Sequence, residues 1–283
     1  MATESAKMAA APALLQARGL CKQFVQRRLF SRKGIVIHAL NGVDFDVAPH
    51  CLTALVGESG SGKSTLASCL AMLERPEQGE IWFEGEEIAC WDDQQLRALR
   101  PKIQVVFQDS AGALNPRFAV AQIIAEPLEI QGREHGARLR SRACELMEEV
   151  GLLPELADRT PLQLSGGQRQ RLAIARAIAL RPELLILDES LSGLDLSTQA
   201  QIVNLLLDLR SVHGLTYLLI SHDLSLVAQV ADFVAVMHKG QIVECGTRAQ
   251  VLGAPRHDHT RSLLASIHNL ETEFHAASAG GWL

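Results

Sequence analysis

A run of small residues and one lysine, residues 57–65, has the residue types and spacing that bind a chain of phosphates. Its glycines let the backbone curl so that several N–H groups point inward, and a helix starting directly afterwards adds its positive N-terminal dipole. The lysine would reach the β- and γ-phosphates of a nucleotide, and the next hydroxyl would hold Mg²⁺. A Gly/Ser turn without a ligand is the alternative. The run is Gly57, Glu58, Ser59, Gly60, Ser61, Gly62, Lys63, Ser64 and Thr65.

Two carboxylates, Asp188 and Glu189, follow an apolar stretch at residues 184–187. Parallel strands present their carboxyl ends at one edge of a sheet, and ligands bind at that edge. Asp188 would then hold Mg²⁺ directly or through water, and Glu189 would polarise the water that attacks the γ-phosphate. A strand end whose acidic groups are only solvated is the alternative.

Residues 164–168, Leu-Ser-Gly-Gly-Gln, predict a second helix N-terminus that suits a phosphate. Ser165 is placed to cap a helix that runs to about residue 180, and Gly166 and Gly167 permit close approach of the backbone. One nucleotide does not need two such helix ends from one chain. We therefore expect Ser165, Gly166, Gly167 and Gln168 to serve a nucleotide held by a second subunit. An ordinary capped turn is the alternative.

Apolar runs that alternate with helical patterns must position these residues. The phosphate loop follows a short apolar run at 51–56 and precedes a helix expected over residues 63–73. This alternation indicates an α/β fold with a mostly parallel sheet covered on both faces. The chain changes character from about 119 to 163, and helical spacing at 137–150 indicates a helical insertion there. Other strands are expected at 14–24, 35–47, 79–84, 103–107, 184–187, 216–220, 233–237 and 241–245, and other helices at 137–150, 169–180, 197–211 and 224–230.

Composition excludes several other classes of protein. The 283 residues are 47% hydrophobic, which suffices for a sizeable core, yet no stretch approaches the roughly 18–20 apolar residues of a membrane span. A net charge of −5 and only 4% aromatic residues disfavour a nucleic-acid binder. Six scattered cysteines without a CxxC pair have no zinc or iron–sulfur spacing and fit a reducing cytosol.

These motifs, in this order, resemble the ATP-binding cassette (ABC) ATPases over about residues 13–268. The resemblance implies a single domain with a P-loop NTPase (RecA-like) core, an antiparallel β subdomain and a helical subdomain at about 109–165. It leaves tails at 1–12 and 269–283. It also implies that ATP and Mg²⁺ are the cofactors.

Further site residues follow from the same resemblance. It implies that Gln108 senses the γ-phosphate and Mg²⁺, and that His222 contacts the γ-phosphate and helps to hold Glu189 and the water. It also implies that Asp195 crosses a dimer interface. Phe24 is similar in place to the aromatic residue that stacks on adenine.

Within that family, residues 57–64, 107–109 and 114–117 resemble the ATPases of peptide/nickel importers. The stretch 255–264 resembles the end motif of that group, with Asp258-His259 in place of the usual Pro-Tyr, and Ser190 stands where the family usually has proline. No cysteine follows Cys245, so a metal cluster in the tail is not expected. We expect the late histidines to be solvated, because no ligand spacing recurs among them; they are His257, His259, His268 and His275.

The resemblance implies an ATP-hydrolysing subunit of a membrane importer for a peptide, nickel or metal-chelate substrate. Such a subunit is peripheral to the cytoplasmic face of the inner membrane. Its implied partners are a second ABC ATPase subunit, which we expect to be a paralogue, two membrane permease subunits and a solute-binding protein. No nucleic acid is expected.

A docking surface for a membrane-subunit helix is expected within residues 108–130, with Ile123, Ile124, Pro127 and Leu128 as candidates. The alternative is that these side chains form the core of the helical insertion.

The competing function is a soluble non-transport ABC ATPase that acts on ribosomes or DNA. One cassette instead of two disfavours the ribosome-type members. Only about a hundred residues separate Lys63 from Ser165, without sustained heptads, which disfavours the DNA-repair members.

Overall fold

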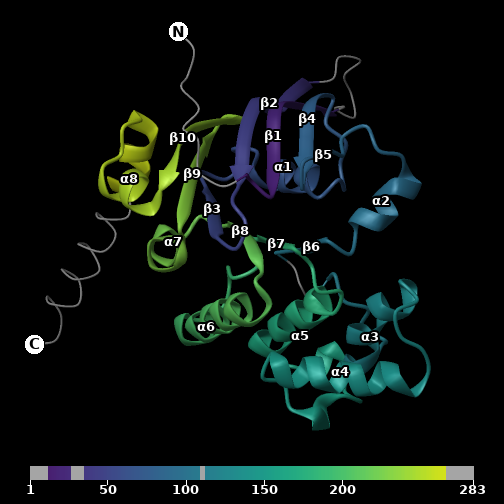
Figure 1. Ribbon diagram of the computed structural model, residues 1–283. Helices are drawn as coiled ribbons and strands as arrows, with labels where there is room; N and C mark the ends of the chain where they lie inside the picture. Colours follow the sequence, from purple (N-terminus) through teal and green to yellow (C-terminus); the bar gives the residue numbers. More distant parts are fainter. Residues whose placement is uncertain (1–11, 27–34, 109–111, 266–283) are drawn as a thin grey trace, which may run out of the picture. The chain divides into compact units, whose positions relative to one another are not determined.

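The computed structural model describes residues 12–26, 35–108 and 112–265 (Figure 1). The chain divides into two compact units. Unit 1 comprises Met1–Leu70, Glu74–Ala89 and Ser221–Leu283, and unit 2 comprises Ala71–Leu73 and Cys90–Ile220. The expectations for residues 1–11 and 269–283, and for His268 and His275, lie outside the described residues.

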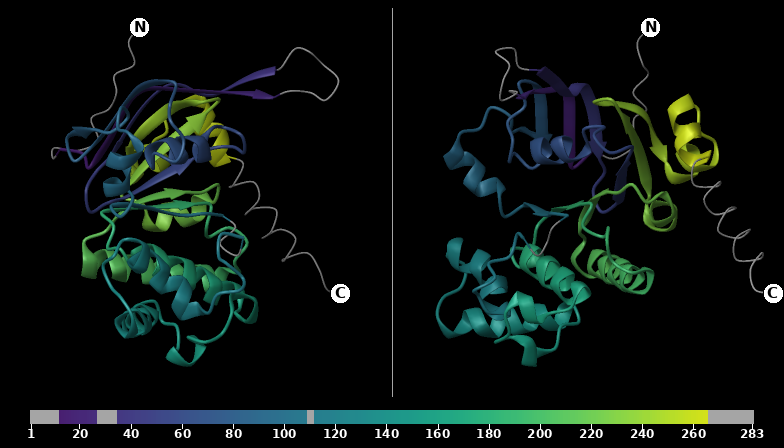
Figure 2. Two further views of the ribbon diagram at one scale, coloured as in Figure 1. Left: turned by 90° about the vertical axis from the view of Figure 1, so that its right-hand side faces the viewer. Right: turned by 180° about the vertical axis from the view of Figure 1, so that it is seen from behind.

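An antiparallel sheet opens unit 1. Its strands are β1 (Leu15–Gln26), β2 (Ile35–Val47), β4 (Gln78–Phe83) and β5 (Glu86–Glu87), in the order β2-β1-β4-β5. Leu15, Ala17 and Leu20 of β1 are fully buried, and the pairing with β2 shifts register after Ala17, where Gly19 has a φ of 60°. Figure 2 shows that β1 and β2 extend together as a long hairpin. The antiparallel β subdomain thus agrees with the expectation.

The second sheet of unit 1 carries the phosphate loop. Strand β3 (Leu52–Val56) pairs in parallel with β9 (Phe233–His238), which pairs antiparallel with β10 (Gln241–Thr247). All five residues of β3 are buried, as a strand covered on both faces requires. Helices α1 (Lys63–Leu70), α7 (Leu224–Val230) and α8 (Arg248–Gly253) also belong to this unit.

Helix α1 is shorter than expected. It ends at Leu70 rather than near residue 73, because Met72 adopts a left-handed backbone with a φ of 53°. The N–H of Glu74 then turns back and donates to the carbonyl of Ser68 at 3.1 Å. This bond satisfies one of the carbonyls that a helix end leaves open.

Unit 2 contains a parallel sheet of β6 (Ile103–Val106), β7 (Leu184–Asp188) and β8 (Thr216–Ile220), with β7 in the middle. Helices α2 (Asp93–Leu99), α5 (Gly166–Ile178) and α6 (Leu196–His213) belong to the same unit. The buried Tyr217 of β8 donates its hydroxyl to the carbonyl of Leu206 in α6 at 2.8 Å. This bond ties the sheet to the helix that covers it, and the buried hydroxyl is satisfied.

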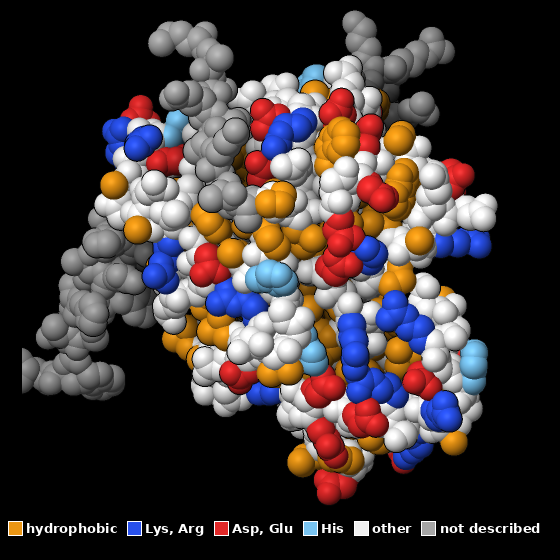
Figure 3. Space-filling model, in the orientation of Figure 1, with side chains coloured by type: hydrophobic (Ala, Val, Ile, Leu, Met, Phe, Trp, Pro, Cys, Tyr) orange, Lys and Arg blue, Asp and Glu red, His pale blue; other side chains and the backbone are white. Residues whose placement is uncertain are grey.

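The helical insertion contains α3 (Val120–Ile130), α4 (Ala137–Glu149) and two 3₁₀ turns, η1 (Pro154–Leu156) and η2 (Pro161–Gln163). Helix α3 packs against α4 and α5 (Figure 1). Acidic and basic side chains are interspersed over these helices on the face that Figure 3 shows. Two of the ion pairs in this part of the chain join Arg140 to Asp158 at 2.8 Å and Arg176 to Glu126 at 2.9 Å.

Three of the four expected docking side chains of α3 are in fact core, whereas Pro127 is only partly buried. Ile123, Ile124 and Leu128 are 1%, 0% and 4% exposed. They form the apolar stripe that α3 turns toward its neighbouring helices, so the prediction that they meet a membrane subunit is wrong. None of the described helices is both long enough and apolar enough to cross a bilayer.

Candidate nucleotide-binding site

The phosphate loop joins β3 to α1, and the side chain of its lysine is hydrogen-bonded to the backbone of the same loop. The ammonium Nζ of Lys63 donates to the carbonyls of Gly57 and Glu58, at 2.9 Å each, and the Lys63 side chain is buried. The N–H of Ser61 donates to the carbonyl of Glu58 at 3.2 Å. The lysine is therefore held at the centre of the curled backbone, where it can meet a phosphate.

Two glycines of the loop have no room for a side chain. A Cβ on Gly57 would lie 2.2 Å from the carbonyl oxygen of Met237, and a Cβ on Gly62 would lie 2.3 Å from that of Ala39. Their φ angles are 152° and 109°, which also favour glycine. The glycines thus let the loop pack closely against strands β9 and β2.

The β9–β10 hairpin supports the loop from the side. The N–H of Gly240, in the turn of this hairpin, donates to the carbonyl of Ser61 at 2.8 Å, and its carbonyl accepts from the N–H of Asn41 at 2.9 Å. Sequence reasoning missed this support, because nothing in the spacing of Gly240 links it to a loop almost 180 residues earlier.

The segment around His222 is fixed beside the end of β3 in the same unit. The N–H of Ser221 donates to the carbonyl of Leu55 at 3.2 Å, and the Ser221 hydroxyl accepts from the N–H of Asp223 at 2.9 Å. Asp223 caps α7 by accepting from the N–H of Leu226 at 3.0 Å. Exposed His222 lies between these two anchors. The structure therefore places the His222 segment and the phosphate loop at the same end of β3.

Phe24 also belongs to unit 1, on β1. Phe24 is 42% exposed, and the ammonium of Lys22 lies 5.6 Å from the centroid of its ring. An exposed aromatic face is what stacking on a base requires, and a cation over the ring is a favourable contact.

In unit 2, buried strand β7 ends at Asp188, and the backbone then turns sharply. Glu189 has a φ of 47°, a left-handed conformation that costs a non-glycine residue about 1–3 kcal/mol. The N–H of Glu189 donates to the carbonyl of Ile220 at 3.1 Å, and its carbonyl accepts from the hydroxyl of Ser192 at 2.6 Å. These bonds hold the strained residue, and strain of this kind is concentrated at functional sites.

Ser190, which stands where the resembled family usually has proline, is 2% exposed. Its hydroxyl has no hydrogen-bond partner among the described residues. A buried hydroxyl without a partner destabilises the fold.

Helix α5 begins as its sequence predicts. The Ser165 hydroxyl accepts from the N–H of Gln168 at 3.2 Å, and the Gln168 side chain accepts from the N–H of Ser165 at 2.9 Å, which is a complete capping box. Ser165 and Gly166 are exposed, so the positive end of the helix faces solvent. A Cβ on Gly167 would lie 2.6 Å from Cγ2 of Thr198, so this glycine lets α5 pack against the start of α6.

Asp195 caps α6. Its carboxylate accepts from the backbone N–H of Thr198 at 2.9 Å and from the Thr198 hydroxyl at 2.7 Å. The hydrogen bond from the Thr198 hydroxyl and then that from its N–H lower the pKa of Asp195, so this exposed carboxyl is ionised near neutral pH.

Gln108 follows β6 and is exposed, and Phe107 beside it is 43% exposed. Unit 1 thus contains Phe24, the phosphate loop and His222, whereas unit 2 contains Gln108, the α5 cap, Asp188, Glu189 and Asp195.

The expectation that the late histidines are solvated is wrong for His259. Its side chain is partly buried, and its Nε2 atom is closed off from solvent. Burial, and then the nearby His238, lower the pKa of His259. The exposed His257 accepts through Nδ1 from the N–H of His259 at 3.1 Å.

The loop, the acidic strand end and the capped helix are the elements of a P-loop cassette, and comparison with known proteins assigns the family. A family model described as ABC transporter matches residues 40–192. The chain belongs to the ABC transporter family.

Two ATP-binding proteins of transport systems are similar to this chain over most of its length. The dipeptide transport ATP-binding protein DppF of Escherichia coli K12 is 45% identical over 261 residues, which are 92% of this chain and 78% of DppF. The glutathione import ATP-binding protein GsiA of Salmonella typhimurium is 47% identical over 255 residues, which are 90% of this chain and 41% of GsiA. The chain therefore spans less than half the length of GsiA.

Solved structures have the same fold. The dimeric ATP-binding cassette MJ0796, in a post-hydrolysis state with ADP and Pi, superposes with a TM-score of 0.74 at 28% identity, over 83% of this chain and 98% of that one. CbiO1 from Clostridium perfringens, part of the ABC transporter complex cbiONQ, superposes with a TM-score of 0.73 at 28% identity. The superposition covers 86% of this chain and 92% of CbiO1. The expected P-loop NTPase fold is confirmed.

Proposed function

We propose that this chain is the ATP-hydrolysing subunit of a membrane importer, built as a single cassette over about residues 13–268. One observation carries the proposal: the chain contains a phosphate loop with a buried Lys63 and, separately, the exposed and capped N-terminus of α5. In a dimer, each ATP would lie between the loop of one subunit and the Ser165–Gln168 segment of the other. ATP would then stabilise the closed dimer, because only that state supplies both contacts.

Some site residues would bind the nucleotide, and others would position the attacking water. Lys63 and the N–H groups of the loop would hold the β- and γ-phosphates, and Phe24 would stack on the base. Glu189 would take the proton of the attacking water, and His222 would hold the γ-phosphate and the water in line. The left-handed backbone of Glu189 supports this assignment, since backbone strain of this kind is concentrated at functional sites.

Mg²⁺ suits the oxygen donors that these segments offer. The Ser64 hydroxyl, the Asp188 carboxylate and the Gln108 amide oxygen are hard ligands of the type that Mg²⁺ takes, with water and phosphate oxygens completing its shell. The ion would neutralise charge that develops on the phosphates.

The transported substrate is proposed to be of the peptide class. The relatives are named for import of glutathione and transport of dipeptides, and both cargoes are short peptides. Nickel and metal chelates belong to the wider group that the sequence resembles.

The proposed assembly contains this subunit, a paralogous ATPase, two permease subunits and a solute-binding protein, at the cytoplasmic face of the inner membrane. Since the buried residues of α3 are unavailable, we assign the permease contact to exposed apolar side chains near Gln108. Phe107 and Phe118 are 43% and 37% exposed. Exposed apolar side chains suit a protein interface.

Two experiments test the proposal. Lys63→Ala should abolish binding of a fluorescent ATP analogue, and tight MgATP binding by that variant would remove Lys63 from its assigned role. A tagged chain expressed in its own cells should retain the permeases after purification in detergent, and the solute-binding protein should yield a peptide ligand. Co-purification with ribosomes or DNA and without permeases would instead favour the non-transport function.

The contact surface has a matched test. Phe118→Ser should reduce recovery of the permeases, whereas Ile130→Ser at the end of α3, 73% exposed, should leave it unchanged. Equal recovery with both variants would reject the assigned surface.

A further inference from the structure

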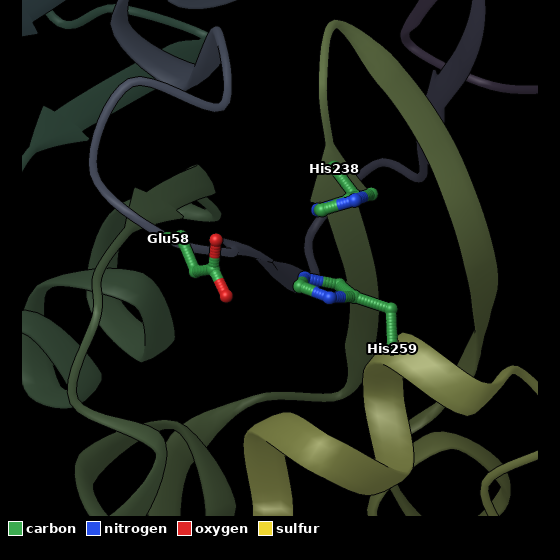
Figure 4. Close-up of side chains that lie close together, drawn as sticks. All are labelled: Glu58, His238 and His259. Carbon is green, nitrogen blue, oxygen red and sulfur yellow. The ribbon is translucent and has the colours of Figure 1, made fainter.

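Three side chains that can ligate a metal ion meet in unit 1 (Figure 4). Glu58 comes from the phosphate loop, His238 from the end of β9, and His259 from the segment that follows α8. One ligand atom from each lies within 4.8 Å of the other two. Residues from three separate segments of unit 1 thus converge at one point.

The two histidines are held on well-anchored backbone. His238 pairs with Gln241 across a two-residue turn in which Lys239 and Gly240 have φ angles of 46° and 78°. The segment of His259 is tied to β10, because the Glu244 carboxylate accepts from the N–H groups of Arg256 at 2.8 Å and of His257 at 3.0 Å. These bonds fix the backbone positions from which the two imidazoles project.

The contact between the two rings needs an explanation. Their centroids are 3.8 Å apart and their planes are inclined by 33°. Nε2 of His259 is closed off from solvent and has no hydrogen-bond partner among the described residues. A buried polar atom without a partner is costly, and ligation of a metal ion would satisfy it.

We propose that Glu58, His238 and His259 form a binding site for a divalent transition-metal ion, with Zn²⁺ as the best-fitting ion. Two imidazoles and one carboxylate are a donor set that Zn²⁺ takes, with water at a fourth position. Mg²⁺ and Ca²⁺ prefer oxygen donors only, so the site differs in kind from the Mg²⁺ site proposed at the nucleotide. The Glu58 side chain is exposed, which leaves a path for the ion and for the water.

Only a small adjustment would close the site. Bonds of about 2.0–2.2 Å in a tetrahedron place donor atoms about 3.4 Å apart. The present separations are at most 4.8 Å, so the donors must approach one another by no more than about 1.4 Å. Rotation of the exposed Glu58 side chain about its own bonds can bring its carboxylate into range. The two imidazole rings, whose centroids are now 3.8 Å apart, must also splay so that a nitrogen of each faces the same ion.

The site would fasten the C-terminal segment to the phosphate loop. His259 and Glu58 are 201 positions apart, and the ion would join them directly. Because the unfolded chain lacks this constellation, the ion would bind the folded state and stabilise it.

The test uses the purified full-length chain, stripped of metal and free of nucleotide. Zn²⁺ is titrated by calorimetry, and Co²⁺ is titrated by visible absorption, which reports tetrahedral coordination. The variants are His238→Asn and His259→Phe, the second of which keeps an aromatic ring beside His238. The matched control is His135→Asn, an exposed histidine of unit 2.

We expect both site variants to weaken Zn²⁺ binding by at least about tenfold and to lose the tetrahedral Co²⁺ spectrum, with the control unchanged. Zn²⁺ should raise the melting temperature of the wild type and of the control but not of the site variants. Melting without metal shows that the variants are folded, and His259→Phe should be no less stable because it removes the unsatisfied nitrogen. Equal Zn²⁺ affinity in all four proteins, or a Co²⁺ spectrum dominated by thiolate ligands, would overturn the proposal.

Discussion

Replacing Gly62 by alanine tests how the phosphate loop is built. A Cβ at this position would lie 2.3 Å from the backbone oxygen of Ala39 and 2.8 Å from the terminal carbon of Met237. Real Cβ contacts stay above 3.0 Å, so the loop or β2 must move by about 0.7 Å. Gly60 is the matched control, because it has a φ of 76° in the same loop and no heavy atom within 4 Å of an added Cβ.

The magnitude follows from this difference. Both alanines cost about 1–2 kcal/mol for a left-handed backbone, and only Gly62→Ala adds about 1–3 kcal/mol for overpacking. Gly62→Ala should therefore melt several degrees below Gly60→Ala, at about 2–4 °C per kcal/mol for a domain of 150–250 residues. Calorimetry without nucleotide measures the difference. The same melting temperature for both variants would show that the loop does not depend on this close packing.

Three further predictions concern other parts of the fold. Ser165→Ala should lower the free energy of unfolding, measured by urea denaturation, by about 1 kcal/mol, because α5 loses its cap. Ser197→Ala is the control, and an equal loss of stability in both variants would contradict the capping role. Ser190→Ala should raise that free energy by about 1 kcal/mol, since it removes a buried hydroxyl without a partner among the described residues, and a clear loss of stability would show that the hydroxyl is bonded. Burial alone would raise the pKa of Glu244, but hydrogen bonds from the N–H groups of Arg256 and His257 help to hold it below its ordinary value of 4.5. As the pH falls, Glu244 is therefore protonated in the unfolded chain before it is protonated in the folded chain. The stability advantage of the wild type over Glu244→Gln should be full above pH 4.5 and shrink as the pH falls below it. A difference in melting temperature between the two proteins that stays constant from about pH 6 to 3 would contradict this.

Local signals in the sequence predicted most of the fold. The Ser165 cap was predictable because a capping box is encoded within four residues, and β3 and β7 were predictable because strands buried on both faces are continuously apolar. The end of α1 was not predictable, since it depends on the left-handed backbone of Met72, and methionine is not a residue that favours this conformation.

Features that depend on packing between distant segments escaped prediction. The apolar spacing of α3 fits a core and a docking surface equally well, and only the packing of α4 and α5 shows that Ile123 and Ile124 are core. The grouping of Glu58 with His238 and His259 has no sequence spacing at all, because it depends on how β9 and the C-terminal segment meet the phosphate loop.

The central claim is that this chain hydrolyses ATP with Glu189 as the base, in a dimer closed by ATP. The most direct measurement is the rate of ATP hydrolysis by Glu189→Gln in the assembled transporter, together with its oligomeric state by sedimentation in MgATP. Glu155→Gln, an exposed carboxylate in η1, is the control. We predict that Glu189→Gln binds MgATP, remains as a closed dimer and loses turnover, while the control behaves as the wild type. Hydrolysis by Glu189→Gln at the wild-type rate would contradict it.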